Sequence, residues 1–365
     1  MIYDLTVIGA GPGGCAAAIT AARAGMRVLL LERGRYPRHR VCGEFVSAEA
    51  LELLANLLSS TNLGLVRGAP KISQSRVFAD ECVLHLPVHP SASSIPRFDM
   101  DRALWESCLQ AQVDGRQSCS VQSVEGESPF VVTTNMGVFR SLTLVNAAGR
   151  WSFLTNSKTR KSARSEPWVG IKAHFFETDP SATVDLYFFN GGYCGVQPVV
   201  LPGFAHSPGV VNACAMVEAK VATELVEVLH LHPALRRRSQ SWRAATGQVR
   251  TSPLVFHKPE PVQRKIFQVG DAATFVDPFV GDGISLALRS GVLAAECLQE
   301  HFRGAPLRNV ATQYKLLYMR RLAPVFRASS VLRTLLRLPK LVRRPAISVL
   351  RHAPLLTRQM VRMTR

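Results

Sequence analysis

The 365-residue sequence lacks several features that would place it outside ordinary globular proteins. No segment reaches the ~18 unbroken apolar residues of a membrane-spanning helix, and the first apolar run has no basic segment before it, as a signal peptide would have. The eight cysteines include no CxxC pair and no metal-like spacing, so we expect reduced thiols without a disulfide framework or a zinc site. These absences predict a cytoplasmic protein that is soluble or peripherally bound to a membrane.

Acidic residues are missing from the end of the chain, after Glu300. Residues 301–365 hold 15 of the 44 Lys and Arg, so the first 300 residues carry 29 basic against 26 acidic residues, and the tail supplies most of the net charge of +18. Such asymmetry predicts an anionic partner. Apolar residues at helical spacing between the arginines suit an anionic membrane surface or a helical cap on the protein. Interleaved aromatics are scarce there, which argues against nucleic acid.

The first 35 residues follow the pattern of a βαβ unit that binds a dinucleotide. A strand at residues 5–8 leads into a glycine turn that fits GxGxxG, and a helix and a second strand ending at Glu32 follow. The glycines permit a tight turn and the approach of a pyrophosphate, while free N–H groups at the helix start favour the phosphates. Glu32 suits the ribose hydroxyls. The predicted turn residues are Gly9, Gly11, Pro12, Gly13 and Gly14.

A second motif, Gly270-Asp271, follows a buried-strand pattern at residues 267–269, and another glycine-rich turn opens a helix expected at residues 283–301. On these residues the chain resembles the FAD-dependent monooxygenases and geranylgeranyl reductases, two-lobed flavoproteins like the aromatic hydroxylases. The resemblance implies FAD, with the Asp271 carboxylate on its ribityl hydroxyls. It also implies that the helix start approaches the FAD phosphate and the flavin ring through Pro278, Gly281, Asp282, Gly283 and Ile284.

Shorter motifs carry the resemblance through the middle of the chain. Residues 36–44 resemble the loop after the acidic strand, and residues 147–152 resemble a strand end with the pattern DGxxS. In this chain Ala148 replaces the Asp of that pattern, so the resemblance leaves open whether NAD(P)H reduces the flavin. It implies cofactor contacts by Arg33, Arg40, Cys42, Gly43, Arg97 and Gly149.

Cys42 and Glu44 are the candidate catalytic residues. A thiol or a carboxyl group near the flavin can donate a proton to a substrate carbon while the flavin delivers hydride. The alternative interpretation is a buried structural cysteine and a glutamate that pairs with Arg38 or Arg40.

The second lobe offers candidate substrate residues. Residues 188–198 resemble the family's glycine and aromatic strand above the flavin, which makes Tyr193 and Pro198 candidates for lining a substrate cavity. The alternative is a hairpin whose aromatics fill the core. His174, on an expected strand, is interpreted as a packed histidine, with a catalytic base as the alternative.

The predicted fold class is α/β, with a Rossmann-type FAD-binding domain, an inserted antiparallel-sheet substrate domain and a helical C-terminal tail. Helices are expected at residues 51–58 and 101–112, besides those at the two motifs. The FAD-binding domain is assigned to residues 1–70, 96–155 and 256–300, the substrate domain to 71–95 and 156–255, and the basic helical tail to 301–365.

The resemblance implies an FAD-dependent oxidoreductase with three candidate reactions. The favoured one is monooxygenation of a lipophilic aromatic or polyketide-like small molecule through a flavin C4a-hydroperoxide. The alternative is reduction of double bonds in isoprenoid chains, as in the geranylgeranyl reductases. Flavin-dependent halogenation ranks third, because the sequence has no WxWxIP motif.

Overall fold

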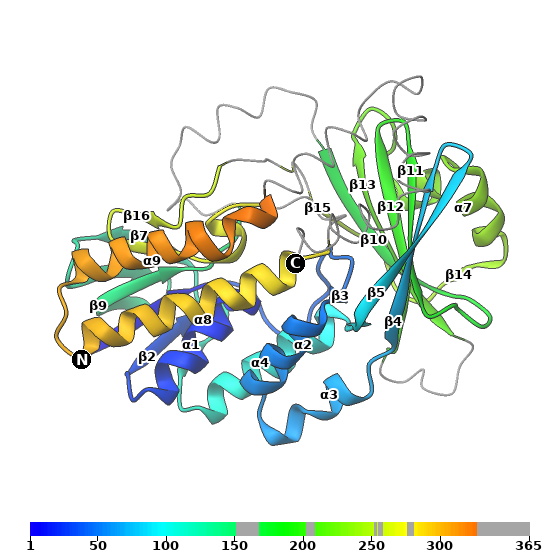
Figure 1. Ribbon diagram of the computed structural model, residues 1–365. Coiled ribbons are helices and arrows are strands. Elements are labelled where there is room, and N and C mark those ends of the chain that lie inside the picture. Colours follow the sequence, from blue (N-terminus) through cyan, green and yellow to red (C-terminus); the bar gives the residue numbers. More distant parts are fainter. Residues whose placement is uncertain (151–167, 202–208, 252–253, 255–257, 276–280, 327–365) are drawn as a thin grey trace.

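The computed structural model describes residues 1–150, 168–201, 209–251, 254, 258–275 and 281–326 (Figure 1). In this part of the chain two sheets stand side by side, one of eight strands and one of nine. Helices cover the first sheet, which has the Rossmann-type arrangement of a nucleotide-binding domain. The α/β fold class predicted from the sequence is confirmed.

The first sheet is built around strand β1 (Ile2–Ile8), which is buried from its second residue onward. It pairs in parallel with β2 (Val28–Leu31) on one side and with β9 (Gly137–Asn146) on the other. Parallel strands that are covered on both faces have continuous apolar sequences, which is the pattern that identifies β1 and β2. The remaining strands of this sheet are β6 (Asp114–Arg116), β7 (Val121–Glu125), β8 (Phe130–Thr134), β16 (Val262–Gln263) and β17 (Ile266–Gln268).

Helix α1 (Pro12–Arg23) packs against α8 (Gly283–Phe302) on one face of this sheet (Figure 1). The helices approach closely because glycines meet at the contact: a Cβ on Gly291 would lie 2.2 Å from the carbonyl oxygen of Gly13. A second apolar cluster contains Phe130 and Val132 of β8 together with Leu29, Leu31 and Leu144. The other helices of this part are α2 (Ala48–Leu57), α3 (Gly64–Arg67), α4 (Arg97–Gln110) and α9 (Leu307–Arg321), with 3₁₀ turns η1 (Ser60–Asn62) and η3 (Gly270–Ala272).

The second sheet places β10 (Trp168–Phe176) beside β13 (Val210–Glu218), followed by β12 (Gly192–Val199) and β11 (Thr183–Phe189), all antiparallel. Strand β11 pairs in parallel with β4 (Lys71–Ala79), so the sheet takes in residues that precede α4. Ile171 and Ala173 bury one face of β10 with α6 and α7, and by strand alternation residues 172 and 174 face the other way. The sheet also holds β3 (Phe45–Val46), β5 (Cys82–Ser94), β14 (Arg243–Ala244) and β15 (Val249–Thr251); α6 (Leu225–Leu229), α7 (Pro233–Arg238) and η2 (Ser239–Ser241) lie nearby.

Helix α4 begins four residues earlier than the sequence pattern predicts. It starts at Arg97, because Pro96 is a suitable residue to precede a helix and Asp99 lies in the first turn. It ends at Gln110, two residues before the expected end, and Gln112 has a φ of 62°. The position of this start matters for the site, because it aims the first N–H groups of α4 at the turn after β2.

Helix α9 belongs to the core of the first domain. Val310, Tyr314 and Tyr318 are buried there, and the Tyr314 hydroxyl donates a hydrogen bond to the Gln268 carbonyl of β17 at 2.8 Å. The first part of the basic tail therefore covers the nucleotide-binding domain, while residues 327–365 lie outside the described residues. Among the helices that the structure describes, none is long and apolar enough to cross a membrane.

Candidate active site

The glycine turn between β1 and α1 has the geometry of a dinucleotide-binding loop. Gly9 has a φ of 100°, and a Cβ there would lie 2.4 Å from the Ala147 carbonyl oxygen. A Cβ on Gly14 would lie 1.9 Å from the Gly9 carbonyl oxygen, whereas a Cβ on Gly11 would meet nothing within 4 Å. The protein's own backbone therefore requires glycine at Gly9 and Gly14. The space beside Gly11 is open, as it must be for a pyrophosphate to reach the backbone.

Glu32 ends β2 as an ionised, nearly buried carboxylate. Its Oε2 accepts a hydrogen bond from the Ala10 N–H at 3.0 Å, and its Oε1 accepts from the Gly34 N–H at 2.8 Å and from Arg38 at 2.7 Å. Burial opposes ionisation, but these N–H groups and the Arg38 guanidinium hold the pKa of Glu32 below its usual value. Three of about four acceptor positions on the carboxylate are filled. The remaining one is available to a ribose hydroxyl.

Arg38, Arg40 and Arg97 form a positive cluster next to Glu32. Arg97 is held by Asp101 through two hydrogen bonds of 2.7 and 2.8 Å, and Arg38 is held by Glu32. Burial and the neighbouring charges of Arg38 and Arg97 lower the pKa of Arg40, and no carboxylate among the described residues pairs with it. A guanidinium in this state suits an anionic diphosphate. With the open space at Gly11, these residues fit the diphosphate and ribose of FAD.

The second cofactor motif lies next to the first. Gly270 has a φ of 56° and donates its N–H to the Ser290 hydroxyl of α8 at 2.9 Å, and Asp271 follows in η3. Gly281 also has a positive φ, 78°, and a Cβ there would lie 2.9 Å from the Phe45 ring. Asp282 is the N-cap of α8, which begins with Gly283 and Ile284, so the positive end of this helix lies at the predicted phosphate side. Pro278 lies outside the described residues.

The remaining predicted residues are placed as follows. Arg33 and Gly43 are exposed, Cys42 is half-buried, and Gly149 is half-buried with a φ of 76°. Tyr193 and Pro198 are both buried, and Tyr193 packs with Met216, Leu254 and Phe275. Their contact with a substrate stays a prediction.

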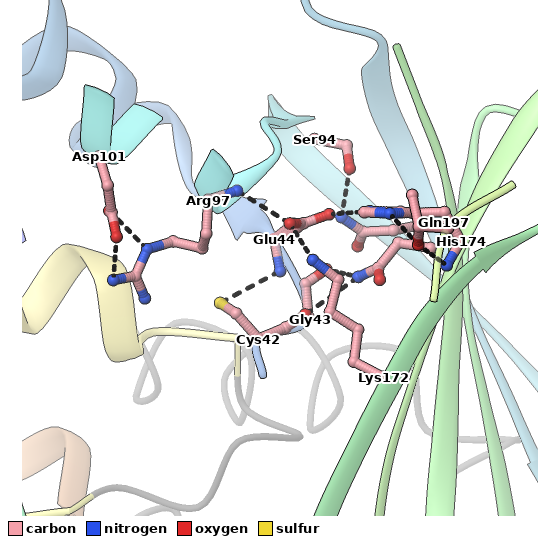
Figure 2. Close-up of polar contacts among 11 residues, drawn as sticks. Cys42, Gly43, Glu44, Ser94, Arg97, Asp101, Lys172, His174 and Gln197 are labelled. Atoms are coloured by element: carbon pink, nitrogen blue, oxygen red, sulfur yellow. Dashed lines mark hydrogen bonds and ion pairs between the residues drawn. The ribbon is translucent and has the colours of Figure 1, made fainter. Parts of the chain in front are cut away.

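Glu44 lies at the centre of a buried ion cluster that joins its turn to the start of α4 and to β10 of the second sheet (Figure 2). Its side chain is 0% exposed; one carboxylate oxygen accepts from the Lys172 ammonium and from the Arg97 N–H, the latter at 2.8 Å. The other oxygen lies 2.9 Å from Nε2 of His174. The alternative interpretation, in which Glu44 pairs with Arg38 or Arg40, is wrong. Its charged partners come from β10, which no local pattern around Glu44 could indicate.

The cluster and the adjacent thiol differ in protonation. Burial alone would favour a neutral acid, but Lys172 and His174 lower the pKa of Glu44 to about 2. Cys42 accepts the Glu44 N–H on its sulfur at 3.3 Å. Burial raises the pKa of the Cys42 thiol, although the nearby charge of Arg97 opposes this. At neutral pH the carboxylate is ionised and the thiol keeps its proton.

Side chains of the second sheet hold the backbone of the same turn. Asn212 of β13 donates hydrogen bonds to the carbonyls of Cys42 and Gly43 at 3.1 and 2.8 Å. Nearby, Gln197 of β12 donates to the Ser94 hydroxyl of β5 at 2.5 Å. Sequence reasoning missed Lys172 and Asn212 as site residues. The available signal was polar residues on strands whose other residues are apolar.

Comparisons with known proteins bear on the cofactor and on the fold. The family model described as FAD dependent oxidoreductase matches residues 4–47. The 1H-pyrrole-2-carbonyl-[peptidyl-carrier protein] brominase of Pseudoalteromonas luteoviolacea is 23% identical over 83% of this chain and 78% of its own. The menaquinone reductase of Mycolicibacterium smegmatis is 26% identical over 97% and 89%. The digeranylgeranylglycerophospholipid reductase of Thermoplasma volcanium is 27% identical over 82% and 78%.

Solved structures share the fold. A flavin-dependent brominase superposes with a TM-score of 0.82 and 19% identity, covering 100% of this chain and 93% of its own. A geranylgeranyl bacteriochlorophyll reductase-like protein of Thermoplasma acidophilum gives a TM-score of 0.76, also at 19% identity, covering 98% and 95%.

The two-sheet fold, the dinucleotide loop and the relatives define a flavoprotein of the superfamily that contains the geranylgeranyl reductases and the flavin-dependent halogenases. The protein is an FAD-dependent oxidoreductase, and its cofactor is FAD.

Proposed function

We propose that the protein reduces a carbon–carbon double bond in a lipophilic isoprenoid chain, with Cys42 as the proton donor. The observation that carries the proposal is a half-buried thiol on a turn that is held by Asn212 of the second sheet and by the start of α4. The named substrates of two relatives, menaquinone and digeranylgeranylglycerophospholipid, both carry isoprenoid chains. This reading replaces hydroxylation, the reaction favoured by the sequence, as the first choice.

The reaction needs one hydride and one proton on the two carbons of the double bond. Bound FAD, once reduced, supplies the hydride. Cys42 supplies the proton, because its raised pKa keeps the thiol protonated at neutral pH. The resulting thiolate regains a proton from water. Glu44 cannot serve as the donor, because its pKa of about 2 leaves it without a proton.

Hydroxylation of an aromatic or polyketide-like molecule is the second candidate. The observation in its favour is that the buried Glu44 carboxyl group is ionised and is occupied by its three partners. A site that uses dioxygen must exclude water and strong acids. Halogenation is disfavoured, because it needs a lysine free to take up hypohalous acid. Lys172 is 1% exposed and paired with Glu44.

The proposal extends to an anionic membrane surface as the place where the substrate is collected. On the outer side of α9, Leu316 is 66% exposed and Met319 is 37% exposed. Arg308, Lys315 and Arg320 are exposed on the same helix. Apolar side chains flanked by basic ones suit the interface of an anionic bilayer.

The experiment compares products with and without dioxygen. The FAD-loaded protein is reduced chemically under argon and mixed with digeranylgeranylglycerophospholipid in detergent, and the products are analysed by mass spectrometry. Double-bond reduction predicts a product two hydrogen atoms heavier in the absence of dioxygen. A product that forms only after dioxygen is admitted, and that contains an added oxygen atom, would replace reduction by hydroxylation.

A further inference from the structure

Glu44 adopts a backbone conformation that is unfavourable for a residue with a side chain. Its φ is 64°, in the left-handed region that glycine tolerates best. A strained residue persists only where the surrounding structure compensates for it, and such residues gather at functional sites. The contacts of the Glu44 side chain are therefore the place to look for what compensates for this conformation.

The carboxylate of Glu44 joins three elements that are distant in sequence. It accepts from the first N–H of α4, at Arg97, and contacts Lys172 and His174 of β10 (Figure 2). The three ionisable side chains of the cluster are at most 1% exposed. His174 is itself oriented by Thr246, whose hydroxyl lies 3.2 Å from Nδ1 of the ring.

The backbone of Glu44 holds the thiol of the same turn. Its N–H points at the Cys42 sulfur, and its carbonyl accepts from the Ile95 N–H at 2.9 Å. Movement of the Glu44 side chain would therefore rotate the group that contacts Cys42. Loss of a cluster partner also changes the charge beside the thiol.

We propose that Glu44, Lys172 and His174 are positioning residues that fix the Cys42 thiol and set the charge around it. The proposal rests on the role of Cys42 given above. None of the three side chains is exposed, so they act on a substrate only through the turn that they hold. Removing Lys172 leaves a buried carboxylate without its cation, and removing the charge of Glu44 leaves the cation without its anion.

The charged groups that face the Cys42 thiol predict that Lys172→Met and Glu44→Gln change the ease of its deprotonation in opposite directions. Lys172 of β10 and Arg97 of α4 favour the thiolate, whereas the Glu44 carboxylate favours the protonated thiol. The thiol of Cys214, on β13, also interacts with Cys42. Lys172→Met therefore makes Cys42 harder to deprotonate, and Glu44→Gln makes it easier. If the cluster only supported the fold, the two substitutions would not change the deprotonation of Cys42 in opposite directions.

The test is a titration of Cys42 in the FAD-loaded protein. Samples are labelled with iodoacetamide over a range of pH, and mass spectrometry of the Cys42 peptide gives the rate for this thiol alone. Lys172→Met is expected to move the midpoint of labelling up by about one pH unit, and Glu44→Gln down by a similar amount. Lys71→Met and Glu52→Gln, at exposed sites, are the matched controls and keep the parent midpoint.

Equal labelling profiles in the parent and both cluster variants, including no labelling at any pH, overturn the proposal. Folding is checked by the melting temperature: Lys172→Met is expected to melt roughly 5–10 °C lower. The double variant Glu44→Gly, Lys172→Met removes the stranded charge and melts above Lys172→Met alone. A double variant that melts no higher contradicts the pairing. Shifted midpoints with full turnover in Cys42→Ala would support the positioning role and refute the proposed function.

Discussion

Alanine substitutions at two glycines of the dinucleotide loop, Gly11 and Gly14, are expected to distinguish effects on cofactor binding from effects on folding. A Cβ on Gly14 would stand 1.9 Å from the Gly9 carbonyl oxygen and 3.0 Å from the Ala147 side chain, so Gly14→Ala forces the start of α1 away from β1. A Cβ on Gly11 meets no protein atom within 4 Å, and its φ of −72° is open to alanine. Gly11→Ala therefore leaves the apoprotein within about 1 kcal/mol of the parent.

FAD affinity is expected to respond to these substitutions differently from the stability of the apoprotein. The new methyl group of Gly11→Ala points into the space assigned to the pyrophosphate and displaces it from the N–H groups of the loop. A hydrogen bond to a charged group contributes about 1.5–3 kcal/mol, so the loss of one weakens FAD binding roughly 10- to 100-fold. Gly14→Ala weakens binding as well, but through overpacking that costs the apoprotein about 1–3 kcal/mol.

The assay measures both quantities on the same samples. Urea unfolding of the apoprotein gives the stability, and titration with FAD, followed by quenching of flavin fluorescence, gives the affinity. We expect that only Gly14→Ala is destabilised and that both variants bind FAD weakly. Parent-like FAD affinity in Gly11→Ala would refute the placement of the pyrophosphate.

Three further predictions follow from charged and apolar groups. Arg40→Ala is expected to weaken FAD binding about 10-fold in the same titration. The stability of the apoprotein should not change, because the Arg40 guanidinium has no carboxylate partner among the described residues. The pKa of Glu44 falls from 4.5 to about 2 on folding, so its ionised form contributes about 3 kcal/mol to stability above pH 4.5, and this contribution is lost as the pH falls toward 2. The free energies of unfolding of the parent and of Glu44→Gln, measured in urea, should converge over this pH range. A constant difference between them contradicts the assignment. The double variant Leu316→Ser, Met319→Ser should sediment less with phosphatidylglycerol vesicles than the parent, and equal sedimentation would count against membrane contact through α9.

The turns and helix starts of the predicted cofactor site follow from local sequence patterns. The glycine loop, Glu32 and the start of α8 are encoded within a few residues of one another, because a turn, a helix start and a strand end depend on short stretches of chain. The buried arrangement of β1 and α1 follows from the same stretch. Helix α4 starts at Arg97, four residues before the start that the sequence pattern predicts.

The reactive half of the site depends on contacts that span the chain. Glu44 meets Lys172 and His174 across 128 and 130 residues, and Asn212 reaches Cys42 across 170. A lysine within an apolar strand carries no sign of its partner. The sequence offers Arg38 and Arg40 as the nearest basic partners of Glu44, but Glu32 holds Arg38.

The central claim is that Cys42 donates the proton in double-bond reduction. The most direct measurement is the anaerobic single-turnover rate at which digeranylgeranylglycerophospholipid reoxidises the reduced, FAD-loaded protein, compared between the parent and Cys42→Ala at equal flavin content. If Cys42 donates the proton, the rate in the variant is about 10²- to 10⁴-fold lower. An equal rate in the two proteins would contradict it.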